Sequence, residues 1–199
     1  MLRIDKEKPG NCRKGLEKLV FKFIDEKINN WDAIIFSDYN KGFVSSNLAK
    51  KVIEIAERKK IPVVVDTKNK NIAHYEGATV ITPNAKEALA ITNIEKAEIA
   101  GKIIAKRYKI KNVLITKGSQ GMTLCYGNKI INISVFSKEV YDVTGAGDTV
   151  VSVLAISLSS GFSLVEAAYI SNVAAGIVVG KVGTSTVSLK ELQDNLLKL

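Results

Sequence analysis

The feature that most restricts the fold is a regular alternation of short apolar runs with amphipathic segments. The apolar runs lie at 33–37, 62–66, 79–82 and 112–116. Between them, apolar side chains recur at the spacing of a helix and lysines take the outer positions. Strands that read as continuous apolar runs and alternate with such helices are typical of a parallel sheet covered on both faces. The pattern therefore predicts an α/β fold with a mostly parallel sheet.

The remaining segments extend this pattern at both ends. Residues 122–126 and 129–133 are predicted to form a hairpin around the turn pair Gly127 and Asn128. Three helices are expected to follow it, at 145–159, 163–179 and 188–198. Near the start, 3–5 reads as a short strand with no evident partner. With no internal repeat or shift of composition, 1–199 is interpreted as a single domain.

Composition excludes several classes of function. His74 is the only histidine, which nearly excludes histidine metal sites and Ser-His triads, and Cys12 and Cys125 have no metal-ligand spacing. No apolar run approaches the ~18 residues of a membrane span, and the N-terminus does not resemble a signal peptide, so a cytoplasmic protein without a membrane partner is expected. The net charge of +9 comes from scattered lysines. These lysines indicate solvated helix faces rather than nucleic-acid binding, although a positive field also attracts phosphorylated small molecules.

Polar side chains follow the ends of the predicted strands. Open sheets of this class bind ligands at the carboxyl ends of their strands, so these residues are expected to form one site. They are Asp38 and Lys41, Asp66 and Lys68, Asn84 and Glu87, the segment Thr116 to Gly121, and the turn Gly145 to Asp148.

The turn Gly145-Ala146-Gly147-Asp148 is the stretch hardest to explain by packing alone. Its N–H groups would lie at the N-terminus of the helix at 145–159, where unpaired donors and the helix dipole favour an anion. Asp148 has two readings: an N-cap, which aspartate does well, or a general base that activates a hydroxyl for attack on a phosphate. A dinucleotide-binding Gly-x-Gly-x-x-Gly motif and a Walker A motif are both absent, so a bound phosphate requires another arrangement.

Three motifs together resemble those of the ribokinase-like (PfkB) carbohydrate kinases over nearly the whole chain. The motifs are Asp142 to Thr149, Asn84-x-x-Glu87, and Thr116-x-Gly118-x-x-Gly121. Within that family the chain is most similar to kinase domains that act on D-glycero-β-D-manno-heptose 7-phosphate. The segments that carry this narrower resemblance are Ser37–Gly42, Asp66–Lys68, Tyr75–Thr79, Thr82–Asn84, Gln120–Leu124 and Ala174–Ser188.

The resemblance implies a role for each site residue. Asp148 would be the catalytic base, and the amides of Gly145, Ala146, Gly147 and Asp148 the anion hole. Asn84 and Glu87 would organise Mg²⁺ and its waters beside ATP, although Asn-x-x-Glu is also a common start of a helix. The residues implied at the nucleotide are Asn84, Thr116, Gly118, Gly121, Asn172 and Gly183.

The reaction implied is transfer of the ATP γ-phosphoryl group to the anomeric hydroxyl, giving the 1,7-bisphosphate. Asp38, Lys41, Asp66 and Lys68 would meet the sugar phosphate, whereas an exposed lysine is otherwise simply solvated. Some family members bind a monovalent cation such as K⁺. The positions that match those loops are Asp142, Thr144, Val178, Lys181 and Gly183.

The chain departs from the family at its start, where the N-terminal strands, a Gly-Gly sugar-binding segment and most of a β-lid have no counterpart. Residues 1–10 are interpreted as a remnant of the lid and 11–199 as the nucleotide-binding core. Three hypotheses follow: a kinase part that assembles with a complementing N-terminal chain, a truncated product that binds nucleotide without phosphorylating, or a nucleotide-binding or dimerising subunit. A homodimer is the other assembly expected.

Overall fold

The computed structural model describes residues 10, 14–136 and 140–198, and within them it confirms the mostly parallel α/β architecture. The strand predicted at 3–5 lies outside the described residues. The strands are β1 (Ile34–Asp38), β2 (Val63–Thr67), β3 (Val80–Ile81), β4 (Asn112–Thr116), β5 (Met122–Tyr126) and β6 (Lys129–Ile133). The helices are α1 (Lys14–Lys27), α2 (Ser46–Arg58), α3 (Ala85–Thr92), α4 (Ala97–Tyr108), α5 (Ala146–Ser159), α6 (Leu164–Val179) and α7 (Leu189–Leu196). Short 3₁₀ turns are η1 (Ile28–Asn30), η2 (Ala73–Tyr75) and η3 (Gly118–Gln120).

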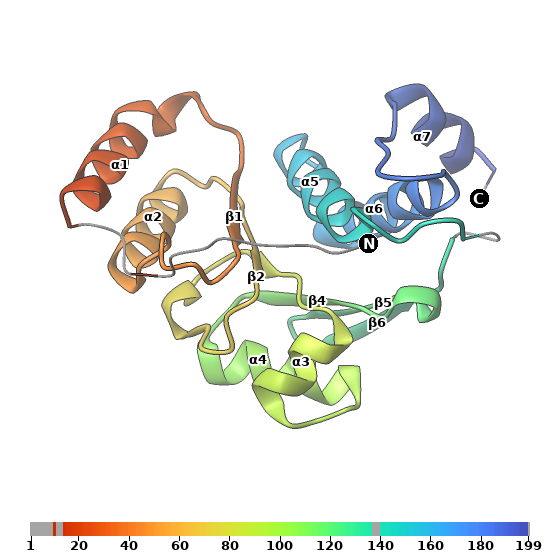
Figure 1. Ribbon diagram of the computed structural model, residues 1–199, viewed down its shortest axis with the longest axis horizontal. Helices are drawn as coiled ribbons and strands as arrows, with labels where there is room; N and C mark the ends of the chain where they lie inside the picture. Colours follow the sequence, from red (N-terminus) through yellow and green to blue (C-terminus); the bar gives the residue numbers. More distant parts are fainter. Residues whose placement is uncertain (1–9, 11–13, 137–139, 199) are drawn as a thin grey trace, which may run out of the picture.

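The strands form one sheet in the order β1-β2-β3-β4-β5-β6. β1 to β4 run parallel, and the hairpin β5–β6 continues the sheet antiparallel from β4. Figure 1 shows α1 to α4 on one side of the sheet and α5 to α7 on the other. Because β1 to β4 share a direction, their carboxyl ends meet at one edge of the sheet.

The two faces of the sheet carry separate apolar cores. Val63 and Val65 of β2 pack with α2 and α4, whereas Val64, between them, packs with α5 and α6. This alternation follows from the two-residue period of a strand. Since each fully buried valine or leucine contributes roughly 1.5–3 kcal/mol, the two cores explain why both helical layers stay on the sheet.

Serine side chains cap the starts of three helices. Ser45 caps α2 by accepting from the Leu48 N–H at 3.0 Å. Ser163 and Glu166 form a capping box at the start of α6, and Ser188 forms one with its glutamate at the start of α7. Each satisfies backbone donors that the helix itself leaves unpaired.

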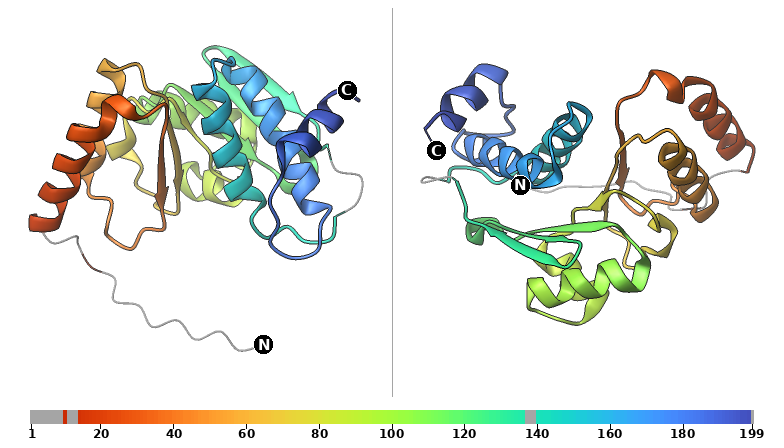
Figure 2. Two further views of the ribbon diagram at one scale, coloured as in Figure 1. Left: turned by 90° about the horizontal axis from the view of Figure 1, so that it is seen from above. Right: turned by 180° about the vertical axis from the view of Figure 1, so that it is seen from behind.

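β1 is the outermost strand of the described sheet, and its surroundings are unusually apolar for a surface. Ile35, the second residue of β1, is 42% exposed, and Leu19 and Phe23 on α1 are 66% and 56% exposed. Figure 2 shows α1 and β1 at the end of the molecule opposite α7. Among the described helices, none is both long and apolar enough to span a membrane.

Candidate active site

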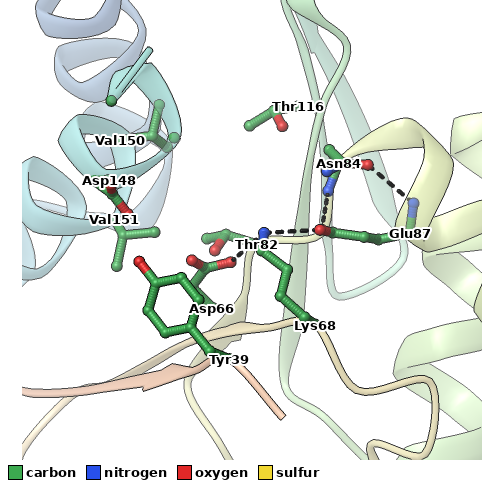
Figure 3. A pocket seen from close by; sticks show the side chains of 12 residues that line it. Tyr39, Asp66, Lys68, Thr82, Asn84, Glu87, Thr116, Asp148, Val150 and Val151 are labelled. Carbon is green, nitrogen blue, oxygen red and sulfur yellow. Dashed lines mark hydrogen bonds and ion pairs between the residues drawn. The ribbon is translucent and has the colours of Figure 1, made fainter. Parts of the chain in front are cut away.

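A pocket of about 270 Å³ opens between the carboxyl ends of the parallel strands and the first turn of α5 (Figure 3). It lies at the edge of the sheet that the strand pattern predicts. Its lining residues are Tyr39, Asp66, Lys68, Thr82, Asn84, Glu87, Thr116, Gly145, Gly147, Asp148, Val150 and Val151.

Strand register brings the polar residues of different segments together. An isolated parallel bridge pairs Asn84 with Thr116, and the Thr116 N–H donates to the Pro83 carbonyl at 3.1 Å. The end of β4 is thereby fixed beside the start of α3. Two motifs that lie about thirty residues apart in the sequence thus form one wall of the pocket.

Lys68 lies between two carboxylates in the centre of the pocket (Figure 3). Its Nζ donates to Glu87 Oε1 at 2.7 Å and lies 3.6 Å from Asp66 Oδ1. Burial opposes the charge of Lys68, but the hydrogen bond to Glu87 and the charges of both acids outweigh it and raise the pKa of Lys68. The ammonium is therefore retained at neutral pH, where it joins β2 to α3.

Asp66 is a half-buried carboxyl at the end of β2, with its side chain 15% exposed. Burial raises the pKa of Asp66; the Lys68 ammonium lowers it in part, while the charges of Glu87 and Asp148 raise it further. Because the charge of Asp148 affects the pKa of Asp66, the two carboxylates lie close enough to interact electrostatically.

Asn84 and Glu87 begin α3 as a complete capping box. The Asn84 side chain accepts from the Glu87 N–H, and Glu87 Oε2 accepts from the Asn84 N–H, both at 2.9 Å. Glu87 Oε1 remains turned toward the pocket, where it meets Lys68. The reading of this pair as a helix start is confirmed, and one carboxylate oxygen still faces the ligand space.

The donor set suits a hydrated divalent cation rather than a protein cage. Among the described residues, no group of three or more His, Cys, Asp or Glu side chains could hold a metal ion by itself. The pocket lining nevertheless carries three carboxylates, Asp66, Glu87 and Asp148, against the single ammonium of Lys68. Mg²⁺ keeps several waters and binds through one or two carboxylates plus substrate phosphates, so an anionic phosphate substrate and Mg²⁺ fit this lining together.

The start of α5 excludes one of the two roles predicted for Asp148. Gly145, with φ of 82°, is the N-cap residue of α5, and no side chain caps this helix. Asp148 lies in the first helical turn and is exposed to the pocket. The N-cap reading of Asp148 is therefore wrong, because the left-handed backbone at Gly145 starts the helix three residues earlier.

The predicted anion hole needs one correction. The Ala146 N–H donates to the Val143 carbonyl at 3.2 Å, which closes a turn, so Ala146 offers no donor to a ligand. Within the described part of the chain, the N–H groups of Gly145, Gly147 and Asp148 have no hydrogen-bond partner. These three donors lie at the positive end of the α5 dipole.

Asp38 and Lys41, two residues predicted to meet the sugar phosphate, do not line the pocket. Asp38 is 6% exposed and accepts hydrogen bonds from Tyr75, Thr67 and Asn40. These three donors hold its carboxylate, and its expected contact with the sugar phosphate stays a prediction. Lys41, from the same loop, is exposed and does not line the pocket.

Asn172 is likewise turned inward from the position expected beside adenosine. It is 7% exposed, and its Nδ2 donates to the Ser134 carbonyl at 2.8 Å. The side-chain amide therefore fastens the segment after β6 to α6. This bond uses one of the two Nδ2 hydrogens, and the expected contact with the nucleotide stays a prediction.

The remaining predicted positions occupy two loops next to the pocket. Gly118 and Gly121 belong to the turn η3, directly after Thr116. The loop of Asp142 and Thr144 lies against the end of α6, since the Tyr141 and Asp142 N–H groups both donate to the Val179 carbonyl. The residues expected at a monovalent cation therefore lie on adjacent segments: Asp142 and Thr144 on one loop, and Val178 at the end of α6 with Lys181 and Gly183 on the loop that follows.

Four lining residues were not predicted from the sequence: Tyr39, Thr82, Val150 and Val151. Tyr39 directly follows β1, as Lys68 follows β2, so its place at a strand end could have revealed it. The two valines carry no such signal, because an apolar residue in an apolar helix reads as core.

Comparison with known proteins agrees with this geometry. The family model described as "pfkB family carbohydrate kinase" matches residues 17–191. The "Bifunctional protein HldE" of Geobacter metallireducens is 41% identical over 198 residues, covering 96% of this chain and 40% of that protein. The protein of the same name from Haemophilus influenzae strain PittEE is 42% identical over 204 residues, covering 98% and 41%. The chain thus spans about two fifths of the length of these relatives.

Solved structures show the same fold at lower identity. Phosphofructokinase-2 from Escherichia coli, in complex with fructose-6-phosphate, aligns with a TM-score of 0.73 at 19% identity, covering 96% of this chain and 64% of that one. Ribokinase from Arabidopsis thaliana, complexed with ribose and ATP, aligns with a TM-score of 0.72 at 23% identity, covering 94% and 60%. The fold is therefore ribokinase-like.

Proposed function

The chain belongs to the pfkB family of carbohydrate kinases, and on that premise we propose that it transfers the γ-phosphoryl group of ATP to a sugar phosphate. The acceptor that its sequence resemblance favours is D-glycero-β-D-manno-heptose 7-phosphate, phosphorylated on the anomeric hydroxyl to the 1,7-bisphosphate. One observation carries the proposal: the Asp148 carboxylate and the unpaired N–H groups of Gly147 and Asp148 border the same pocket as Lys68.

In this reaction Asp148 accepts the proton of the attacking hydroxyl. A general base must lie within hydrogen-bond reach of that proton, and an exposed carboxylate on the first turn of α5 can approach a hydroxyl held over the pocket. The N–H groups of Gly145, Gly147 and Asp148 receive the charge of the transferred group, aided by the α5 dipole. Lys68 adds a positive charge from the opposite wall.

Magnesium and its waters would be held by Asn84 and Glu87 beside the ATP phosphates. When bound, it supplies neutralisation of the phosphate charge. The chain's own contribution is to hold Glu87 Oε1 toward the pocket, which the capping box with Asn84 does by fixing Oε2.

The nucleotide would extend from Thr116 over η3, where Gly118 and Gly121 form the turn. A pocket of about 270 Å³ is small for a complete ligand site, and it suits the reacting phosphates with adenosine lying outside it. Gly183 would border adenosine, while Asn172 supports this region through Ser134. A monovalent cation such as K⁺ would bind between the loop of Asp142 and Thr144 and the one after Val178.

The free side of β1 supports assembly with a complementing polypeptide, with a homodimer as the other arrangement. An unpaired strand edge offers backbone donors and acceptors to another strand. Ile35, at 42% exposure, adds apolar area there. Residues 11–199 would then be a nucleotide-binding core whose acceptor side is completed by the added strands.

The test is an ADP-release assay with ATP, Mg²⁺ and the heptose 7-phosphate, run on the chain alone and with a fragment that supplies the N-terminal part of a relative. Sugar-dependent ADP release that disappears in Asp148→Asn is the expected result. An Asp194→Asn variant, altered at an exposed aspartate of α7, serves as the control. Binding of ATP without turnover under both conditions would contradict a kinase and favour a nucleotide-binding subunit, and failure to bind ATP would contradict both.

A further inference from the structure

The buried carboxylate of Asp38 joins two loops that border the pocket. Its Oδ1 accepts from the Asn40 N–H at 2.8 Å, and its Oδ2 accepts from Thr67 Oγ1 at 3.0 Å and from the Tyr75 hydroxyl at 2.8 Å. A buried carboxylate is costly unless such donors satisfy it. These three bonds therefore fix where the chain can go as it leaves β1.

The loop after β2 is held by the same group. Thr67 donates to Asp38 and accepts from the Asn69 N–H at 3.0 Å, while the Lys68 N–H donates to the Asp38 main-chain carbonyl at 2.9 Å. The backbone on both sides of Lys68 is thereby tied to Asp38. A change at Asp38 is consequently transmitted to the pocket through two loops at once.

Tyr75 provides the anchor of this network from the protein interior. It is fully buried on η2, where its ring contacts that of Phe36 at a centroid distance of 5.5 Å. Burial, together with the hydrogen bond to Asp38, raises the pKa of Tyr75, so its hydroxyl remains a donor. Packing holds the ring in place and the hydroxyl holds the carboxylate, as a positioning group requires.

The residue that this network places at the pocket is Tyr39. It stands between Asp38 and Asn40, and Asn40 has a left-handed backbone with φ of 56°. This turn sends the Tyr39 side chain outward, 58% exposed, so that it lines the pocket on the side of Asp66 and Asp148 (Figure 3). Asn84, Glu87 and Thr116 form the other side.

We propose that Tyr39 is an acceptor-binding residue, held against the sugar phosphate by the buried network of Tyr75, Asp38 and Thr67. This inference rests on the proposed function for its acceptor. In the proposed function the ATP phosphates lie on the side of Asn84 and Thr116, which leaves the Tyr39 side for the sugar. An aromatic ring offers an apolar face and a hydroxyl there, both suited to a polyhydroxylated ring.

The first experiment needs no catalysis. Amide hydrogen exchange is compared between the wild-type chain, Tyr75→Phe and Ser171→Ala, a control that removes another fully buried hydroxyl, one bonded within α6. Tyr75→Phe should lower the protection of the Asn40 and Asn69 amides on the order of 10-fold relative to amides of α6. Ser171→Ala should leave those two amides unchanged. Unchanged protection in Tyr75→Phe, or equal loss throughout the molecule, would overturn the positioning role.

The second experiment measures binding by calorimetry with D-glycero-β-D-manno-heptose 7-phosphate and, separately, with Mg-ATP. Tyr39→Ala and Tyr75→Phe should each weaken sugar-phosphate binding on the order of 10-fold and change ATP binding less than about 2-fold. Tyr39→Phe should recover most of the loss of Tyr39→Ala through its ring. Equal weakening of both ligands, or wild-type affinity in Tyr39→Ala, would overturn the acceptor role.

These arms separate the inference from the function on which it rests. Sugar binding that depends on Tyr39 without any turnover would contradict the kinase proposal and support the acceptor assignment. If the wild-type chain binds ATP but no sugar phosphate, even with the complementing fragment, the acceptor role of Tyr39 is overturned, while the exchange experiment still decides the positioning role.

Discussion

The two glycine turns beside the pocket look alike in sequence and differ in what requires their glycines. At Gly121, after η3, φ is 77° and ψ is −135°, and a Cβ would lie 2.0 Å from the Ile133 carbonyl oxygen. At Gly147, in the first turn of α5, the backbone is helical and a Cβ would meet no atom within 4 Å. The fold demands glycine at the first position and leaves room for a side chain at the second.

This difference shows which of the two glycines is evidence for a bound ligand. A glycine inside a helix costs roughly 0.5–1 kcal/mol relative to alanine, and nothing in the described fold offsets that cost at Gly147. The open space beside it borders the pocket. A phosphate that approaches the backbone at this point accounts for the glycine, whereas Gly121 is fully explained without one.

The largest effect is expected at the acid that the α5 turn presents. Asp148→Asn should lower kcat by ~10²–10⁴ and leave ATP affinity nearly unchanged, as for the loss of a positioned base. Steady-state kinetics with a parallel ATP titration measure both quantities. Wild-type turnover in this variant would contradict the assignment of Asp148 as the general base.

Gly147→Ala should lower activity and raise stability. We expect kcat/KM to fall about 10²-fold, because the methyl group displaces the transferred phosphate, while the free energy of unfolding rises by about 0.5–1 kcal/mol. Gly15→Ala is the matched control: Gly15 is also the second residue of a helix, α1, with no atom within 4 Å of its Cβ position. If Gly147→Ala loses stability or keeps full activity, the distinction between the turns is wrong.

Gly121→Ala should show the converse behaviour, with stability as its primary loss. The overlap with the β6 end predicts destabilisation of about 1–3 kcal/mol, added to strain in a backbone region that other residues avoid. Gly127→Ala isolates the second contribution, since Gly127 has φ of 55° but no atom near its Cβ position. Denaturant unfolding of both variants gives the difference, and equal losses would show that overlap contributes nothing.

The smallest expected effect concerns Asp66, on the wall facing the α5 turn. Its raised pKa means that the native state still holds a proton at a pH where the unfolded chain has lost it. This group therefore makes stability fall as pH rises above the ordinary pKa of 3.8. Asp66→Asn should therefore gain stability relative to wild type between pH 3 and pH 7, by about 1 kcal/mol or less. Thermal unfolding across that range measures it, with Asp194→Asn as the exposed control. If the stability gained by Asp66→Asn shrinks as pH rises, the pKa of Asp66 is not raised by burial.

Most of the fold was predictable because its signals are local. The bounds of β4 and of the β5–β6 hairpin follow directly from apolar runs and a Gly-Asn turn. Capping by Ser45 and Ser163 is likewise a local interaction, within the first turn of each helix. Only residues outside the described range, such as the strand expected at 3–5, leave the pattern untested.

The site was less predictable, because a side chain's direction depends on distant partners. Asp38 follows a strand as Lys68 does, yet Tyr75, thirty-seven residues away on a 3₁₀ turn with no periodic signal, draws its carboxylate inward. Asn172 is turned to Ser134 in the same manner. The roles assigned to Asp148, Glu87 and Lys68 stay predictions until the variants are measured.

The edge of β1 that pairs with no other described strand has a practical consequence for work with this chain. A strand edge beside an exposed isoleucine, Ile35, can pair with the same strand of another molecule, and repeated pairing of that kind leads to aggregation. Solubility should therefore fall steeply with protein concentration and recover when a charged residue replaces Ile35. Work with this chain will therefore depend on the five residues of β1, the outermost strand of the described sheet.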